Sequence, residues 1–154
     1  MIKRINDKTS QQNLLAIWVS SHHETYEEGV TFFTPNELEM QVGYMRYNAG
    51  HEFKAHKHIK HNRVITRTCE TLLICKGALR FDLYREDGDP VFSGVAVAGD
   101  ILILIAGGHG FQATEDLELI ECKQGSFNPK YDKCPLFAED IKETETHNGT
   151  LSNA

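Results

Sequence analysis

The sequence predicts an all-β protein, a sandwich or barrel of short strands. Alternating apolar and polar residues recur along most of the chain, and turn residues separate these runs at intervals of about 8–12 residues. No convincing amphipathic helical pattern occurs before residue 136. The length of 154 residues suits one domain that can bury a hydrophobic core.

The first predicted strands lie in the N-terminal third of the chain. Residues 1–13 are polar and show no clear period, whereas residues 14–19 are apolar and form a candidate strand. Residues 30–33 and 39–47 follow as strands. Ala49 and Gly50 interrupt this pattern. After the break we expect one more strand over 53–58, and then an extended, basic loop over 59–68.

The second half has clearer hairpin signals. Leu79, Phe81 and Leu83 alternate with polar residues, which indicates a half-buried strand. Turn residues at 76–77, 86–89, 99–100 and 107–108 delimit the predicted strands 70–75, 78–84, 91–97, 101–105, 109–114 and 117–124.

The domain organisation follows from these elements. Residues 1–38 form an N-terminal segment with one or two strands, which offers a dimer contact. Residues 39–137 form the barrel. Residues 138–154 are polar and are expected to be disordered.

Composition excludes several classes of partner. The formal net charge of −6 argues against nucleic acid or an anionic membrane as the main partner. No apolar run is long enough for a transmembrane helix, and the N-terminus lacks the apolar region of a secretion signal. We therefore expect a cytoplasmic protein whose four cysteines are reduced and, in the strands, act as small core residues.

His56 and His58 are the most informative pair in the sequence. Side chains of a strand alternate between its faces, so these two imidazoles would point to the same side. Two imidazoles on one face form half of a metal site if other strands supply the rest. On an exposed strand the same pair would simply be solvated.

The surrounding residues resemble the two motifs of the cupin family. Gly50 is followed by five residues and then His56-x-His58, and Glu70 is followed by six residues and then Gly77. Eleven residues separate His58 from Glu70, where the family has three or four. A second motif resembles residues 99–109, from Gly99 to His109, with a different spacing and without the family's Pro and Asn.

This resemblance implies a fold and a set of ligands. The fold is the jelly-roll barrel, or double-stranded β-helix, of the cupins, over roughly residues 40–125. The implied metal ligands are His56, His58, Glu70 and His109, with His61 as the alternative to Glu70. Three imidazoles and one carboxylate suit a divalent transition metal such as Fe, Mn, Ni, Co or Zn, and leave coordination positions open for a substrate.

Other residues are candidates for a substrate pocket. Lys54 would share a face with His56, and Phe111 would share one with His109. The basic residues of the loop would lie near the cavity mouth and suit a carboxylate or phosphate, unless they are merely solvated: Lys57, Lys60, Arg63 and Arg67.

Three functions remain open at this point. The first is a metal-dependent dioxygenase or isomerase that acts on a small anionic metabolite. The second is a metal-free isomerase or epimerase similar to the sugar-nucleotide cupins, with histidines as acid and base. The third is a cupin that binds a small ligand without catalysis. A homodimer is expected by analogy, with Trp18 and Phe32 as apolar anchors.

Overall fold

The computed structural model describes residues 1–9, 13–21, 26–128 and 131–137. The expected disordered tail over 138–154 lies outside the described residues. Within the described residues the chain forms ten strands and no helix. The strands are β1 Ile2–Asn6, β2 Leu14–Val19, β3 Gly29–Phe32, β4 Gly43–Arg46, β5 Glu70–Lys76, β6 Ala78–Tyr84, β7 Pro90–Val97, β8 Ile101–Leu104, β9 Gly108–Ala113 and β10 Glu118–Lys123. The predicted all-β class is confirmed.

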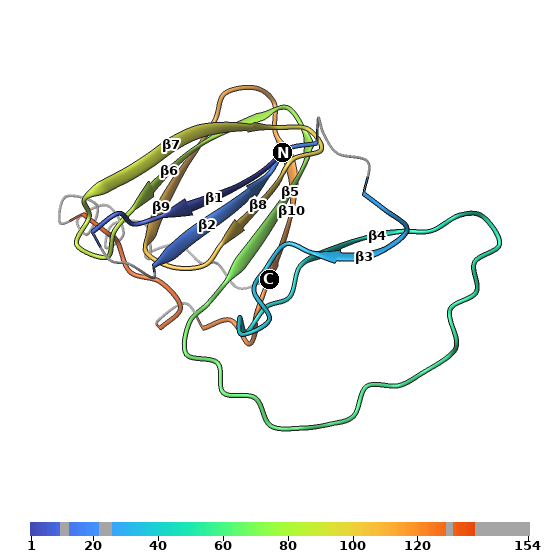
Figure 1. Ribbon diagram of the computed structural model, residues 1–154. Coiled ribbons are helices and arrows are strands. Elements are labelled where there is room, and N and C mark those ends of the chain that lie inside the picture. The colour runs from blue at the N-terminus through green and yellow to red at the C-terminus, as the bar shows by residue number, and fades with distance from the viewer. Residues whose placement is uncertain (10–12, 22–25, 129–130, 138–154) are drawn as a thin grey trace, which may run out of the picture.

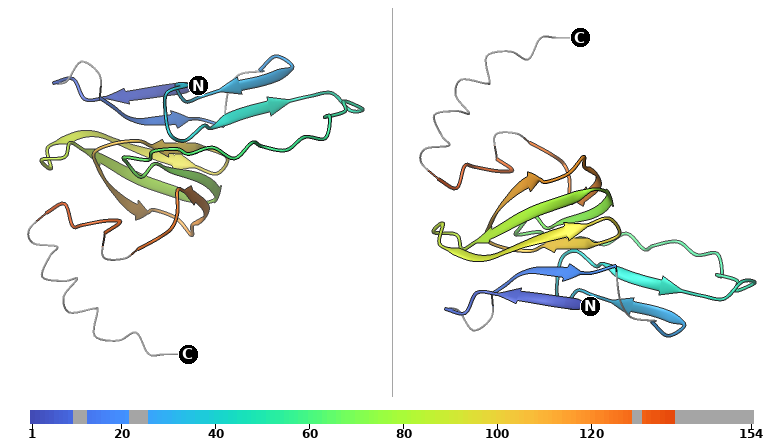
Figure 2. Two further views of the ribbon diagram at one scale, coloured as in Figure 1. Left: turned by 90° about the horizontal axis from the view of Figure 1, so that it is seen from below. Right: turned by 90° about the horizontal axis from the view of Figure 1, so that it is seen from above.

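The strands form three antiparallel sheets. One has the order β1-β2-β8-β5-β10, a second has the order β7-β6-β9, and β3 and β4 form a separate hairpin (Figure 1). The five-stranded and three-stranded sheets stack face to face, and the β3–β4 hairpin projects beyond them (Figure 2). The described strands do not close into a barrel, because β9 and β10 each pair on one side only.

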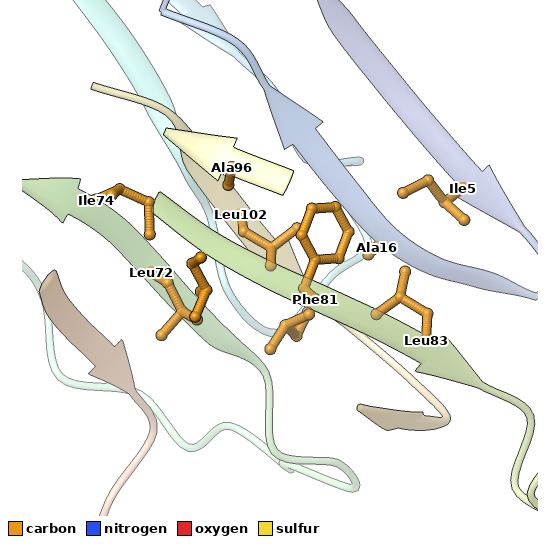
Figure 3. Close-up of a cluster of buried hydrophobic side chains, with 10 residues drawn as sticks. Ile5, Ala16, Leu72, Ile74, Phe81, Leu83, Ala96 and Leu102 are labelled. Carbon is orange, nitrogen blue, oxygen red and sulfur yellow. The ribbon is translucent and has the colours of Figure 1, made fainter. Parts of the chain in front are cut away.

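The space between the two large sheets holds the main hydrophobic core (Figure 3). Phe81 of β6 is fully buried at its centre, and the edge of Trp18 approaches it at 5.5 Å between ring centroids. Alternate residues of each strand point inward, as the period of two requires. The buried members are Ile5, Ala16, Leu72, Ile74, Leu79, Phe81, Leu83, Ala96, Leu102 and Leu104.

A second cluster covers the outer face of the five-stranded sheet. Ile17 and Ile103 point away from the main core and pack beneath Phe33 and Met40, which precede β4. Strand β8 is therefore buried on both faces, which explains why its sequence is apolar throughout instead of alternating.

The N-terminal segment is part of the large sheet. Strand β2 pairs with β1 on one side and with β8 on the other. Trp18 points into the core and its Nε1–H donates to Asp100 at 2.9 Å, so this ring is not a surface anchor. Phe32, the other expected anchor, is 54% exposed on the hairpin.

Three local predictions differ from the structure. Strand β1 lies within residues 1–13, where no strand was expected. The strand predicted over 39–47 is limited to Gly43–Arg46. Residues 47–69 form one long extended segment without ladder pairing, so 53–58 is not a strand. Neither face of Phe53-Lys-Ala-His-Lys-His58 is continuously apolar, so burial does not drive this segment onto a sheet.

The turn between β5 and β6 depends on Gly77. This residue has φ +75°, and a Cβ there would overlap the carbonyl oxygen of Asp116. We expect Gly77→Ala to destabilise the protein by more than the ~1–2 kcal/mol of the left-handed conformation alone. Gly50→Ala is the matched control, because Gly50 has φ +88° and open space around it. Equal losses for the two variants in urea unfolding would show that the clash has no effect.

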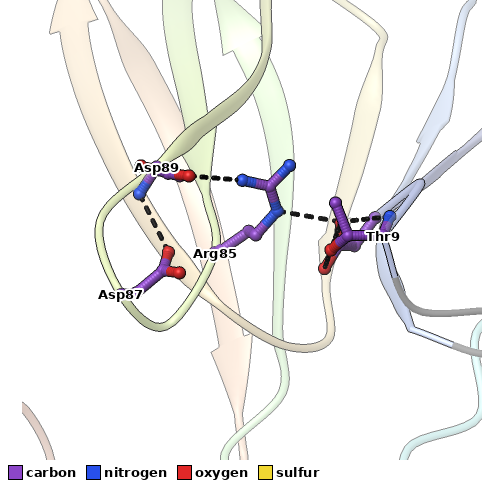
Figure 4. Close-up of polar contacts among 5 residues, drawn as sticks. Thr9, Arg85, Asp87 and Asp89 are labelled. Carbon is purple, nitrogen blue, oxygen red and sulfur yellow. Dashed lines mark hydrogen bonds and ion pairs between the residues drawn. The ribbon is translucent and has the colours of Figure 1, made fainter.

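A partly buried ion pair connects the N-terminal strands to the β6–β7 turn (Figure 4). Asp7 is 6% exposed and accepts the Nε–H of Arg85 at 2.9 Å. It also accepts hydrogen bonds from the backbone and the hydroxyl of Thr9. Arg85 donates from Nη1 to Asp89 at 2.7 Å. These contacts join parts of the chain that are 78 residues apart.

Acid should weaken this connection. The hydrogen bond from the backbone of Thr9, followed by that from Arg85, holds the pKa of Asp7 below its usual value. A carboxyl group whose pKa is lowered by folding stabilises the protein when the pH is above its unfolded-state pKa of about 3.9. This contribution to stability disappears as the pH falls through the lower pKa of the folded state. We expect the difference in unfolding midpoint between the wild type and Asp7→Asn to shrink below about pH 4. A difference that stays constant from pH 7 to pH 3 would contradict this assignment.

Candidate functional site

Glu70 and His109 meet at the open side of the sandwich. Glu70 begins β5 on the same face as the core residues Leu72 and Ile74, so its side chain points between the sheets. His109 lies on β9 opposite the buried Leu83 of β6, and it also points inward. The two side chains are 3.3 Å apart, from Nε2 of His109 to Oε2 of Glu70. The contact thus bridges the two sheets.

Lys123 completes this charged cluster. It is the register partner of Glu70 on β10, and its Nζ lies 3.6 Å from Glu70 Oε1 and 3.1 Å from Glu121 Oε1. The hydrogen bond with His109 holds the pKa of Glu70 below its usual value, and the charges of His109 and Lys123 act in the same direction, while partial burial opposes them. Glu70 is therefore ionised at neutral pH and can accept protons or bind a cation.

An aromatic ring borders the cluster. Phe111 follows His109 by two residues on β9 and stacks on its imidazole, with ring centroids 5.0 Å apart. Phe111 is 43% exposed although it faces its partner Phe81 across the ladder, because no strand covers the outer edge of β9. The inward-facing cluster thus combines a carboxylate, an imidazole, an ammonium group and an aromatic ring.

The turn before β9 requires a glycine. Gly107 has φ +72°, and a Cβ there would overlap the carbonyl oxygen of Tyr84 at the end of β6. The turn before β9 therefore passes very close to the backbone at the end of β6. Gly107 directly precedes the first residue of β9 and lies two residues before His109.

The other two predicted ligands lie apart from this cluster. His56 and His58 are exposed in the extended segment, with ring centroids 5.4 Å apart. The Nδ1 of His56 lies 3.0 Å from the carbonyl oxygen of Lys54. Across the described part of the chain, no three side chains of the His, Cys, Asp or Glu type converge on a point that could hold a metal ion. The structure therefore brings Glu70 and His109 together, whereas His56 and His58 lie apart from them.

The remaining candidates of the loop are also exposed. Lys54 lies on the extended segment. His61 accepts a hydrogen bond from Arg63 at 2.9 Å, and both remain in solvent. Arg67 lies 3.8 Å from Glu39 and lines a shallow groove of about 360 Å³ that also includes Gly107.

Two residues of the site, Glu121 and Lys123, were not predicted from the sequence. Glu121 and Lys123 follow Leu117 and Leu119 on one face of the last strand, so the period of two could have placed them on the same face as these leucines, whereas only the ladder register brings Lys123 opposite Glu70. The cysteines also differ in part from expectation. Cys69 is buried, but Cys75 and Cys122 are exposed on β5 and β10, and all four thiols are free.

Comparisons with known proteins do not supply a family. No protein-family model matches the chain, and neither the curated proteins nor the solved structures give a match. In the described part of the structure, no helix has the length and apolar character needed to cross a membrane. The functional argument therefore rests on the geometry of the site.

Proposed function

We propose that this protein is a cupin-type jelly roll that binds a divalent transition metal and, through it, a small anionic metabolite. The observation that carries the proposal is the contact between Glu70 and His109 across the open side of the sandwich. Carboxylate and imidazole are ligands that these metals share. His56 and His58 would complete the site when the extended segment docks on this side.

The order of the strands supports such docking. The layers β10-β5-β8 and β9-β6-β7 lie face to face, and both have a free edge at the side of Glu70. A jelly roll has eight strands in two sheets. Residues 43–46 and 53–58 could add one strand to each layer, at β10 and β9 respectively. The unpaired backbone groups of an edge strand are a ready template for this addition.

Charge favours the same movement. The extended segment carries Lys54, Lys57, Lys60, Arg63 and Arg67 and only one carboxylate between residues 51 and 67. Glu118 and Glu121 lie on the edge strand β10, and Glu115 and Asp116 lie in the turn that joins the edge strands β9 and β10. Opposite charges attract the segment toward the edges and then leave some cations free for an anionic substrate.

The residues of the site have distinct roles in this proposal. A bound metal would act as a Lewis acid on the substrate oxygens. Glu70 and His109 would hold the metal from two sheets, and Lys123, whose charge together with His109 helps to keep Glu70 ionised, would offer a cation to the substrate. Phe111 shields one side of the imidazole from water.

A metal-free acid–base function is the second candidate, because the contact of Glu70 with His109 already has the geometry of a base oriented by a carboxylate. Metal reconstitution of the full chain separates the two. We expect about one equivalent of Ni²⁺, Co²⁺ or Zn²⁺ to remain after gel filtration. Failure to retain any transition metal would overturn the metal proposal and leave the acid–base candidate.

A further inference from the structure

A second site lies on the opposite side of the sandwich, between the edge strands β1 and β7. The structure has a groove there of about 470 Å³. Its lining contains four cations and no carboxylate, although the chain as a whole is acidic. The lining residues are Lys3, Arg4, Ile5, Asn6, Lys8, Arg85, Pro90, Val91 and Phe92.

Contacts within the protein hold three of the four cationic side chains in place. Arg85 donates its Nε–H to Asp7 and one N–H of Nη1 to Asp89 (Figure 4). A guanidinium has five N–H donors, so three remain for an anion. The Nζ of Lys3 lies 3.9 Å from the centre of the Phe92 ring, and Arg4 donates to the carbonyl oxygen of Phe33 at 3.0 Å.

The carboxylates that neutralise Arg85 are not part of the lining. Asp7 is buried and also bonded to Thr9, and Asp89 holds Arg85 from the β6–β7 turn with a largely exposed side chain. A guanidinium that two contacts already orient loses little conformational freedom when it binds an anion. The groove therefore differs from an ordinary exposed cluster of lysines.

From this arrangement we infer that the groove binds a small phosphate monoester that carries an apolar group. The dianionic phosphate fits among Lys3, Lys8 and Arg85, since a guanidinium and ammonium groups bind phosphate oxygens by charge-assisted hydrogen bonds. The apolar group fits against Val91 and Phe92. This site uses no residue of the Glu70–His109 cluster and does not depend on the proposed metal function.

Titration of the full-length, ¹⁵N-labelled protein with phenyl phosphate tests the proposal. We expect saturable shifts of the backbone amide signals of Lys3, Lys8, Arg85 and Phe92. The double variant Lys3→Gln/Lys8→Gln should bind at least about tenfold more weakly, because two charge-assisted contacts are lost. Both lysines are exposed strand or turn residues, so the fold should be retained.

The matched control is Lys76→Gln/Lys133→Gln, which removes the same charge away from the groove and should bind as the wild type does. Equal weakening by both double variants would overturn the site, since it would indicate only general attraction. Shifts that do not saturate, or that spread over all surface cations, would overturn it as well. Benzoate should bind more weakly than phenyl phosphate, and equal affinity would contradict the assignment to a phosphate.

Discussion

The variant His109→Ala is expected to bind Ni²⁺ or Zn²⁺ at least about 100-fold more weakly than the wild type, because loss of a direct ligand should exceed the 10–100-fold cost of losing an outer-shell partner. His109 is the imidazole that the fold already holds against Glu70. Its side chain lies on an edge strand and is 34% exposed, so the substitution leaves the main core intact. Competition with a chromogenic chelator measures the affinity directly.

His51→Ala is the control for this measurement. His51 lies at the start of the same extended segment, where it stacks on Tyr47, and should not affect the affinity. An equal loss for the two variants would indicate binding by scattered surface histidines. His56→Ala and His58→Ala should resemble His109→Ala if the segment docks.

The fourth ligand is decided by a second pair of variants. Glu70→Gln keeps the size of the side chain but removes its charge, and we expect about a tenfold or greater loss of metal affinity. His61→Ala should leave the affinity unchanged, since His61 is bonded to Arg63 in solvent. The reverse result would assign His61 as the ligand in place of Glu70.

Phe81→Ala is expected to have the largest effect on stability, a loss of about 3–5 kcal/mol. Phe81 is fully buried and packs against Trp18 and Phe92, with ring centroids 5.5 and 5.8 Å away. Gly94 on β7 leaves room for the ring, since a Cβ there would come within 2.8 Å of its Cζ. Removal of the ring therefore leaves a cavity that bulky neighbours cannot fill without moving the sheets.

Phe111→Ala is the matched control, because Phe111 is the cross-strand partner of Phe81 and is 43% exposed. Its loss should cost about 1 kcal/mol, in proportion to the smaller area that it buries. Urea unfolding followed by Trp18 fluorescence measures both variants. Similar losses would contradict the placement of the core between β6 and the five-stranded sheet.

The sequence predicted the strands whose faces differ in polarity. Leu79, Phe81 and Leu83 alternate with polar residues, and the structure buries all three in β6. Strand β1 was missed because it carries only two apolar residues, Ile2 and Ile5, and its length depends on pairing with β2. Pairing between distant segments is a tertiary effect that local periodicity does not contain.

The candidate site was also predicted only in part. Motif spacing connected Glu70 with His109, which the structure places 3.3 Å apart. The ladder register that brings Lys123 beside Glu70 could not be derived from single strands, since a shift by one residue reverses the faces. The basic groove was missed for the same reason, because Lys3 and Arg85 are 82 positions apart in the sequence and come to line one groove only when the edge strands β1 and β7 lie on the same side of the sandwich.

The proposal that a metal unites the two halves of the site is tested most directly by a crystal structure of the reconstituted protein, with anomalous diffraction recorded at the absorption edge of the metal. The account predicts one strong anomalous peak about 2.0–2.2 Å from Nε2 of His109 and from a carboxylate oxygen of Glu70, with His56 and His58 as further ligands. A peak elsewhere on the chain, or none beside His109, would contradict it.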